Sequence, residues 1–244
     1  MPRFFVTQDT LSGKFAHLTG EAASHIRVLR LEKGDRVTLC TGDGLEHEGV
    51  ISDLQQGAVS VVLHASGESQ SEPKLKCSVY MALAKADKFE HVVQKATELG
   101  AAEIIAFPSA RCVSRPDERA LAKKLERWQK IAVSAAEQSG RGLIPKVLTV
   151  SSFEDAVRRA CEAELPIVCY ENEAHHSLRA AVTGAQVSTC ALMTGPEGGF
   201  TEEEMTFAQS AGMQVCTLGP RILRCETAPL CALTAVLFSA GEYD

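Results

Sequence analysis

Two loops near the C-terminus constrain the fold of this chain more than any other stretch. Residues 194–200 contain three glycines and a proline, and residues 218–228 form a second loop about two dozen residues later. Each loop follows a short apolar run that is typical of a buried strand, and each precedes a helix signal. Two strand–loop–helix units side by side would place both loops at the carboxyl edge of one parallel sheet, where ligands of α/β proteins bind.

The residues of the first loop indicate what kind of ligand it suits. Its glycines let backbone N–H groups approach a ligand closely, and residues 201–204 form a capping box that predicts a helix after Thr201. No Gly-Lys-Ser/Thr sequence closes the loop, so it is not a phosphate loop, and Glu197 also disfavours a phosphate. A ligand with a positive centre, or one held by backbone groups, fits better. One such loop taken alone is equally typical of an ordinary connection.

The chain as a whole predicts two domains. In residues 1–65, short β-branched runs around a helix at 21–31 predict a small β-barrel. Residues 66–73 are polar, lack periodicity and form the best linker in the chain. After this linker, strand and helix patterns alternate, which predicts a mostly parallel sheet. The sequence therefore predicts an α/β fold with domains at 1–70 and 73–244.

Apolar runs and stripes place the elements of the second domain. Apolar stripes predict helices over residues 89–100 and 121–140, and Trp128 lies on the second stripe, which is more typical of the core than of a base-stacking platform. A third helix is expected over residues 227–240, with Thr227 as its cap. The expected strands cover residues 77–84, 104–107, 167–170, 190–193 and 215–218.

The distribution of charge matters more than the formal net charge of −6. Residues 73–145 carry 13 Lys and Arg against 8 Asp and Glu, whereas the segments on either side of them are acidic. A local basic face can hold nucleic-acid phosphates on an acidic protein. The alternative is a solvated helix surface with no partner.

Composition excludes several classes of protein. No stretch approaches the ~20 uninterrupted apolar residues of a membrane span, and the first residues lack the pattern of a signal peptide. The nine cysteines are scattered, with no Cys-x-x-Cys and no paired histidine ligands. A disulfide scaffold and a metal site are therefore not expected, and a reducing cytoplasm is the better interpretation.

Four stretches together resemble one protein family. They are GPEGGF at 195–200 and LGPRILRCETA at 218–228, with KFE…QKATELG at 88–100 and WQKI…AAEQSGR at 128–141 upstream. In order and spacing they resemble the SPOUT class of S-adenosylmethionine-dependent RNA methyltransferases. Within that class they resemble the ribosomal RNA small subunit methyltransferase E family, which methylates N3 of a uridine in 16S rRNA.

The resemblance implies features that periodicity does not predict. The C-terminal domain would be a SPOUT domain with a trefoil knot, which is otherwise too rare to propose. Residues 1–70 would form a PUA-like RNA-binding β-barrel, and the protein would work as a homodimer with its site near the subunit interface. The cofactor would be S-adenosylmethionine, and the partner would be 16S rRNA within the small ribosomal subunit, without a metal or a membrane.

The resemblance also assigns residues to the site. The cofactor would be held by residues of the two loops and of the strand before the first loop. They are Leu192, Thr194, Gly195, Pro196, Glu197, Gly198, Gly199, Leu218, Gly219, Pro220, Ile222, Leu223, Arg224, Thr227 and Ala228.

For the reaction, the expected catalytic residues are Arg224, Glu226 and Glu197. Uridine N3 must lose a proton, so a cation beside the base would favour the anion and a carboxylate could accept the proton. Arg224 is expected to supply the cation, with Glu226 or Glu197 as base or cofactor anchor. An intraloop ion pair or compensation of the charge at a helix end is an equal alternative, and Cys225 stands where a threonine is expected in the family.

Candidate RNA-binding residues lie in the first domain and in the basic middle. They are Arg27, Arg30, Lys85, Lys88, Lys95, Arg111, Arg115, Gln138 and Arg141, and each is as typical of an ordinary surface or packing residue. His25 matches the histidine of the family's N-terminal pattern with a shortened spacing, and a hydrogen bond at a helix end is its alternative role. Two other functions stay open: a related SPOUT enzyme acting on tRNA or a ribose 2′-hydroxyl, and a non-catalytic RNA-binding protein.

Overall fold

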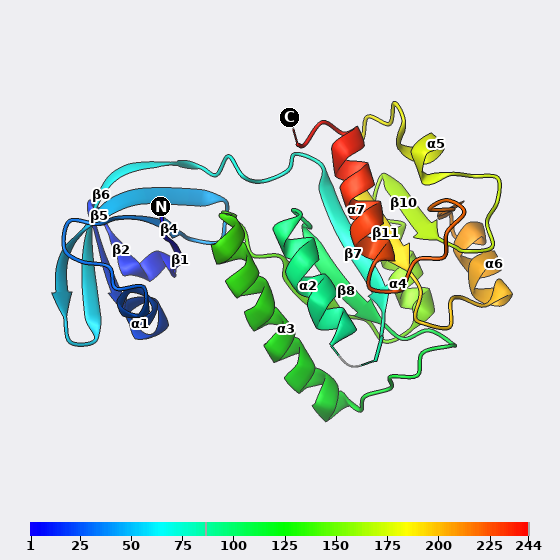
Figure 1. Cartoon of the computed structure of the whole chain (residues 1–244), viewed down its shortest axis with the longest axis horizontal. Helices are drawn as coiled ribbons and strands as arrows, with labels where there is room; N and C mark the ends of the chain where they lie inside the picture. Colours follow the sequence, from blue (N-terminus) through cyan, green and yellow to red (C-terminus); the bar gives the residue numbers. More distant parts are fainter. Residues whose placement is uncertain (86, 244) are drawn as a thin grey trace. The chain divides into compact units, whose positions relative to one another are not determined.

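The structure is a computed structural model that describes residues 1–85 and 87–243 (Figure 1). The chain divides into two compact units. The first comprises residues 1–72 with 136–144, and the second comprises residues 73–135 with the chain from 145 onward. Residues 136–144 thus group with the N-terminal unit, which no sequence pattern indicated.

The first unit is built on a six-stranded sheet with the order β1-β4-β5-β6-β3-β2. Its strands are β1 Arg3–Phe5, β2 Leu11–Ser12, β3 Phe15–Thr19, β4 Arg36–Cys40, β5 Leu45–Gln55 and β6 Ala58–Glu68. Strands β1 and β4 pair in parallel, and the other neighbours pair antiparallel. A 3-10 helix covers Gln8–Thr10, and α1 covers Gly20–Val28.

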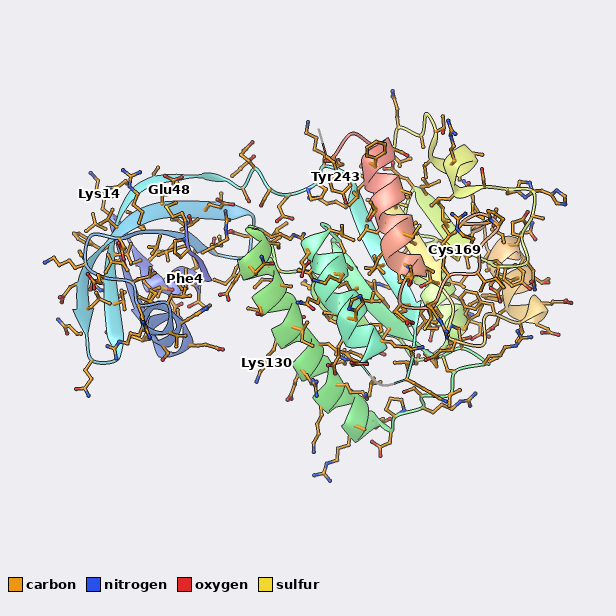
Figure 2. The ribbon with its side chains drawn as sticks, in the orientation of Figure 1. Phe4, Lys14, Glu48, Lys130, Cys169 and Tyr243 are labelled. Carbon is orange, nitrogen blue, oxygen red and sulfur yellow. The ribbon has the colours of Figure 1, made fainter. Side chains whose placement is uncertain are left out.

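The core of the first unit forms where apolar side chains of the sheet meet α1. Phe4, which Figure 2 labels, is fully buried together with Ile26 of α1 and Leu39 of β4. The expected helix at 21–31 is present but ends at Val28. Strand β6 continues to Glu68, so part of the expected linker at 66–73 is strand.

The second unit contains a six-stranded parallel sheet with the order β12-β10-β11-β7-β8-β9. Its strands are β7 Lys76–Ala82, β8 Glu103–Phe107, β9 Lys146–Thr149, β10 Leu165–Cys169, β11 Thr189–Thr194 and β12 Gln214–Cys216. The expected α/β fold with a mostly parallel sheet is confirmed. In β7, β8 and β11 nearly every consecutive residue is buried, as in a sheet covered on both faces.

The helices of the second unit pack onto this sheet. They are α2 Lys88–Glu98, α3 Glu118–Ser139, α4 Phe153–Ala160, α5 Leu178–Val182, α6 Glu202–Ser210 and α7 Ala228–Ser239. Helix α7 packs on β7, β11 and α2, whereas α4 packs on β7, β8, β11 and α6. The last four residues of α3 group with the first unit.

One expectation about the sheet is wrong. The strands before the two loops, β11 and β12, are not neighbours, because β10 lies between them and pairs in parallel with both. Strand order in a parallel sheet is set by crossovers between distant segments, so the adjacency of two units along the chain does not fix it. Both loops still lie at the carboxyl edge, and the segment after β10 lies between them.

Local helix signals were mostly reliable. The capping box is formed, because the Thr201 hydroxyl accepts from the Glu204 N–H and the Glu204 carboxylate accepts from the Thr201 N–H. Thr227 precedes α7, but its side chain makes no capping hydrogen bond. Trp128 is 2% exposed and packs against Phe89 with ring centroids 4.3 Å apart, so its core position is confirmed.

The strand pairings do not show whether the chain is threaded through a loop, so the trefoil knot stays a prediction.

Among residues 1–85 and 87–243, no helix is long and apolar enough to cross a membrane. Over the same residues, no group of three or more His, Cys, Asp or Glu side chains could hold a metal ion.

Candidate active site

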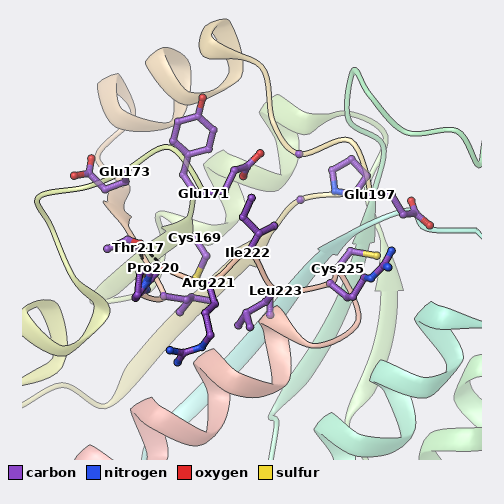
Figure 3. A pocket seen from close by; sticks show the side chains of 18 of the residues that line it. Cys169, Glu171, Glu173, Glu197, Thr217, Pro220, Arg221, Ile222, Leu223 and Cys225 are labelled. Atoms are coloured by element: carbon purple, nitrogen blue, oxygen red, sulfur yellow. Dashed lines mark hydrogen bonds between the residues drawn. The ribbon is translucent and has the colours of Figure 1, made fainter.

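A cavity of about 810 Å³ opens at the carboxyl ends of β10, β11 and β12. Figure 3 shows it from close by. Three loops and the start of α2 enclose it. It is lined by Lys88, Cys169, Tyr170, Glu171, Glu173, Ala174, Gly195, Pro196, Glu197, Gly199, Thr217, Leu218, Gly219, Pro220, Arg221, Ile222, Leu223, Arg224, Cys225 and Ala228.

Most residues assigned to the cofactor lie in this cavity, but four do not line it. Leu192 and Thr194 are buried inside β11, and the Thr194 hydroxyl donates to the carbonyl of Tyr80 at 3.4 Å. Gly198 faces Arg111, and Thr227 begins the turn into α7. For these four residues, a role in cofactor binding stays a prediction.

The glycines of the first loop sit where a side chain does not fit. Gly199 has a φ of 67°, and a Cβ there would fall 2.0 Å from Oε1 of Glu171. A Cβ on Gly195 would come within 3.3 Å of the Phe200 ring. From outside, the Arg111 guanidinium donates to the Gly198 carbonyl at 3.1 Å. Gly195 and Gly199 line the cavity, so this loop contributes backbone to its wall.

Lys88 is the least expected member of the site. Its Nζ lies 3.2 Å from Oε1 of Glu197 in the first loop and 3.4 Å from Oε2 of Glu226 in the second loop. It also lies 3.7 Å from Sγ of Cys225. Lys88 was assigned to RNA binding because of its charge, but its ammonium is turned into the cavity wall. One cation thus contacts both loops.

The two carboxylates around Lys88 are held in their charged form. Partial burial opposes ionisation of Glu197, but hydrogen bonds from the Lys85 N–H at 3.0 Å and from Lys88 outweigh it, so the Glu197 pKa is lowered. The pKa of Glu226 is also lowered, first by a hydrogen bond from its own backbone N–H and further by Cys225 and Lys88. Burial opposes the charge of Lys88, but both carboxylates raise its pKa.

Cys225 occupies the position where a threonine was expected. Its thiol donates to Oε2 of Glu226 at 3.2 Å, as a threonine hydroxyl could. Burial, together with the neighbouring carboxylates, raises the pKa of Cys225 to about 11. The thiol is therefore neutral at physiological pH, and it replaces the hydroxyl as a donor.

Arg224 lines the cavity and has an exposed side chain, so it is free to reach a substrate. Of the three expected catalytic residues, Arg224 and Glu197 line the cavity directly. Glu226 reaches it through its contact with Lys88. The structure therefore brings the three residues to one site, with Lys88 among them.

The segment after β10 supplies residues that sequence reasoning missed. Tyr170, Glu171 and Glu173 line the cavity, and in Figure 3 Glu171 and Glu173 lie across the view from Glu197 and Cys225. The signal was available, because the strand at 167–170 was expected and its carboxyl end had to meet the same edge of the sheet. Arg221 and Thr217 complete the second loop.

The remaining RNA-binding candidates of the second unit differ in whether their side chains already contact other groups of the protein. Lys85 is exposed, and only its backbone N–H is used by Glu197. Lys95 pairs with Glu98 at 2.8 Å. Arg115 donates to the carbonyls of Ala110 and Cys112 at 3.0 and 3.3 Å. All of these cations belong to one unit.

The candidates of the first unit include one that is not at the surface. Arg27 and Gln138 are exposed, and Arg30 is exposed with a φ of 56°, unusual for a non-glycine residue. Arg141 is 3% exposed, and its Nη2 lies 2.6 Å from Oε2 of Glu72. A guanidinium enclosed in this way is not presented to RNA, so its expected role is corrected to a structural one.

His25 also has a structural partner. Its ring packs edge-on against Phe4 with centroids 5.5 Å apart, and its Nδ1 lies 3.6 Å from Oε2 of Glu137. The contact joins α1 to the segment 136–144 within the first unit. At 3.6 Å this contact is longer than a hydrogen bond, so both expected roles of His25 stay predictions.

The arrangement suits a particular ligand chemistry. Bare backbone lines one wall, and carboxylates occur on two sides, which favours a ligand with a cationic centre and hydrogen-bonding groups. The exposed cation of Arg224 is available to stabilise negative charge that develops on a second molecule. The cavity can therefore hold a cationic donor beside an acceptor that becomes anionic.

Comparisons with known proteins agree with this chemistry. Residues 70–237 match the sequence model of an RNA methyltransferase domain, and residues 18–63 match that of an RNA methyltransferase PUA domain. Ribosomal RNA small subunit methyltransferase E of Bacillus subtilis is 37% identical, over 98% of this chain and 96% of its own length. The protein of the same name from Synechocystis is 35% identical, over 86% of this chain and 68% of its own.

Solved structures are also similar over the whole chain. One is that of ribosomal RNA small subunit methyltransferase E from Neisseria gonorrhoeae bound to S-adenosyl methionine. It has a TM-score of 0.84 and 32% identity, and the match covers 98% of this chain and 97% of that one. The similarity includes both units.

Proposed function

Because the chain belongs to the ribosomal RNA small subunit methyltransferase E family, we propose that it methylates N3 of a uridine in 16S rRNA. It is an S-adenosylmethionine-dependent methyltransferase that acts on RNA of the small ribosomal subunit. We choose N3 as the methylated atom because residues 195–200 and 218–228 resemble the signature stretches of this family, which methylates uridine at N3. The observation that carries the proposal is that these two stretches enclose one cavity.

The cavity suits S-adenosylmethionine. Glu171 lies against the backbone of Gly199, so a carboxylate and the glycine backbone face the same space. The adenosyl group fits a wall of backbone and small residues, and the positive sulfonium fits a cavity that contains Glu171, Glu173 and Glu197. When bound, the cofactor supplies an electrophilic methyl group.

The residues of the chain would prepare the uracil. Uridine N3 carries a proton that must leave, and the N3–CH₃ bond would form as the bond between the methyl carbon and the cofactor sulfur breaks, which would leave a neutral thioether. The exposed guanidinium of Arg224 would stabilise the negative charge that spreads to the uracil carbonyl oxygens. Glu197 or Glu226 would accept the proton and pass it to water. Their lowered pKa values keep both carboxylates deprotonated and available.

Alignment of the two reactants provides the rest of the catalysis. The methyl donor and the nucleophilic nitrogen must meet in line, and holding them so can account for ~7–11 kcal/mol of the barrier in favourable cases. The loops rest on β11, β12 and α2, whose buried residues fix them. We place Lys85, Lys95, Arg111 and Arg115 among the residues that hold RNA phosphates, with Arg27, Arg30 and Gln138 in the first unit.

We also propose that the protein works as a homodimer in the cytoplasm, where ribosomal subunits mature. Helix α7 exposes Phe238, which is 69% accessible, and also Cys231, about two turns earlier in the helix. A second copy is the partner that would cover these exposed side chains of α7, the helix that follows the second loop. Sedimentation analysis should find a dimer, and Phe238→Glu should shift it toward monomer.

Nucleoside analysis tests the reaction. Small subunits from a strain that lacks the gene are incubated with the protein and S-adenosylmethionine, and the digested RNA is examined by mass spectrometry. We expect 3-methyluridine in 16S rRNA from subunits treated with the wild-type protein, and none with an Arg224→Ala variant at early times. The same assay on naked 16S rRNA identifies the form of the substrate.

The alternatives give different products. A 2′-O-methylated nucleoside, or methylation of added tRNA, would favour a related SPOUT activity. Binding of RNA without any methylated product would favour a non-catalytic RNA-binding protein. The latter is disfavoured by the intact cavity, because a binding protein needs no enclosed site for a methyl donor.

A further inference from the structure

Lys88 joins the two loops of the cavity through one ammonium group. Its Nζ lies 3.2 Å from Glu197 in the first loop and 3.4 Å from Glu226 in the second loop. Its third contact is the Cys225 sulfur at 3.7 Å. The ammonium thus has two ion-pair contacts and one hydrogen bond, all to groups of the protein. In this arrangement Lys88 holds protein groups rather than RNA phosphates.

The helix that carries Lys88 is well anchored. Lys88 is the first residue of α2, and the next residue, Phe89, is 1% exposed and packs on Trp128. Val92 and Val93 are fully buried on the same helix. Helix α2 also packs against α7, which begins where the second loop ends. The ammonium therefore projects from a fixed element toward two loops.

Without this cation the two carboxylates would repel each other. Both lie within reach of the same nitrogen, so Glu197 Oε1 and Glu226 Oε2 are at most 6.6 Å apart, the sum of the two distances. Glu171 and Glu173 add negative charge to the same cavity. Like charges at this separation disfavour joint ionisation, and they would push the loops apart.

We propose that Lys88 is a positioning residue that assembles the cofactor cavity by neutralising one carboxylate from each loop. The inference rests on the proposed cofactor site, and it assigns Lys88 a role different from RNA binding. Because the link reaches both loops, loss of the ammonium weakens cofactor binding even though the bare backbone of Gly195 and Gly199 is unchanged.

The proposal has a consequence for pH dependence. In the wild type, the pKa values of Glu197 and Glu226 are lowered, so neither takes up a proton between pH 6 and 8. Without Lys88, the pair keeps the thiols of Cys225 and Cys112 nearby. Glu171 and Glu173 add negative charge in the same cavity, where the exposed Arg221 and Arg224 remain as cations. One carboxylate pKa then rises, protonation relieves the repulsion, and binding improves as the pH falls.

Calorimetric titration with S-adenosylmethionine at pH 6, 7 and 8 tests this directly. Affinities are expressed relative to the wild type at each pH, which cancels the titration of the ligand. Lys88→Met should bind about 10-fold more weakly at pH 8 and recover about 3-fold by pH 6. Lys88→Arg, which keeps the charge, should stay close to wild type. Lys123→Met, which removes an exposed charge on α3, should equal wild type at every pH.

A double variant isolates the charge pair. In the Lys88→Met background, Glu226→Gln removes the repulsion, so it should strengthen binding about 3-fold at pH 8 and abolish the pH dependence. In the wild-type background the same change removes a partner of Lys88 and should not strengthen binding. If Lys88→Met does not fold, Lys88→Gln with and without Glu226→Gln provides the same comparison.

The outcomes separate the inference from the proposed function. If the wild type binds no S-adenosylmethionine, the proposed function fails. If the wild type binds and the Lys88 variants lose affinity equally at all three pH values, the positioning role is overturned. Further weakening of Lys88→Met by Glu226→Gln would overturn it as well. Unchanged affinity in Lys88→Met would return Lys88 to the RNA-binding candidates.

Discussion

The guanidinium of Arg141 and the carboxylate of Glu72 form an almost fully enclosed ion pair, with Nη2 and Oε2 2.6 Å apart. Their side chains are 4% and 8% exposed. Glu72 also accepts the backbone N–H groups of Gly142 and Leu143 at 3.0 and 3.1 Å. The pair fixes the segment after α3 to the end of the N-terminal unit, and it explains why residues 136–144 belong to that unit.

Removal of Glu72 should therefore destabilise the protein. Glu72→Ala removes a carboxylate that pairs with a buried guanidinium and accepts from two backbone N–H groups, and breaking a buried pair costs about 3–5 kcal/mol. Urea unfolding should show a loss of this size. Glu68→Ala, at an exposed position of β6, should stay within about 0.5 kcal/mol of wild type. Equal stability of the two variants would show that the pair contributes little.

Gly199→Ala should weaken cofactor binding by more than the strain of a positive φ at an alanine would explain. Its Cβ would fall 2.0 Å from Glu171 Oε1, at a φ of 67°. Gly184→Ala is a matched control, because Gly184 has a φ of 75° and open space around its Cβ position. We expect at least about 10-fold weaker S-adenosylmethionine binding in Gly199→Ala only. Similar binding in both variants would mean that Glu171 moves aside freely.

Arg224→Ala should slow methyl transfer without a comparable loss of cofactor affinity. The Arg224 side chain is exposed at the cavity, so it helps only as negative charge develops on the uracil. Loss of one positioned donor costs about 10²–10³ in turnover. Single-turnover assays and calorimetry separate the two effects. Arg224→Lys should rescue in part, because lysine keeps the charge but not the planar fork. Weak cofactor binding with normal turnover would make Arg224 a cofactor residue.

Cys225 should be a poor nucleophile in the folded protein. Burial and the nearby carboxylates raise its pKa to about 11, and alkylation requires the thiolate. At pH 8, iodoacetamide should modify Cys225 about two orders of magnitude more slowly in the native protein than in urea, where its pKa is ordinary. Peptide mass mapping over time measures both rates. Equal rates would contradict the enclosed, protonated thiol.

The salt dependence of RNA affinity should respond to the cations outside the cavity. Each phosphate contact that is lost lowers the log–log salt slope by ~0.7–0.9. Joint replacement of Lys85, Lys95 and Arg115 by alanine should flatten the slope, because these cations do not line the cavity. Arg158→Ala and Arg179→Ala, at exposed sites of the acidic C-terminal third, are the controls. A slope equal to wild type would remove the three residues from the RNA surface.

The most reliable predictions from the sequence were those that depend only on residues close together in the chain. The capping box at Thr201 and Glu204 depends on residues three positions apart, so no distant contact was needed to predict it. The apolar stripe that buries Trp128 likewise follows from helical periodicity. Both glycine-containing loops could be placed at a sheet edge, because each follows a strand and precedes a helix.

The sequence by itself thus determined the class of fold, the elements and the two loops, since these follow from periodicity and turn chemistry along the chain. Only the tertiary structure decided which groups meet. In the tertiary structure β10 lies between β11 and β12, and Arg141 is buried against Glu72. Lys88, expected at the surface, instead contacts both Glu197 and Glu226. The reason is physical: crossovers and packing join residues more than a hundred positions apart, and no local pattern records such a pairing.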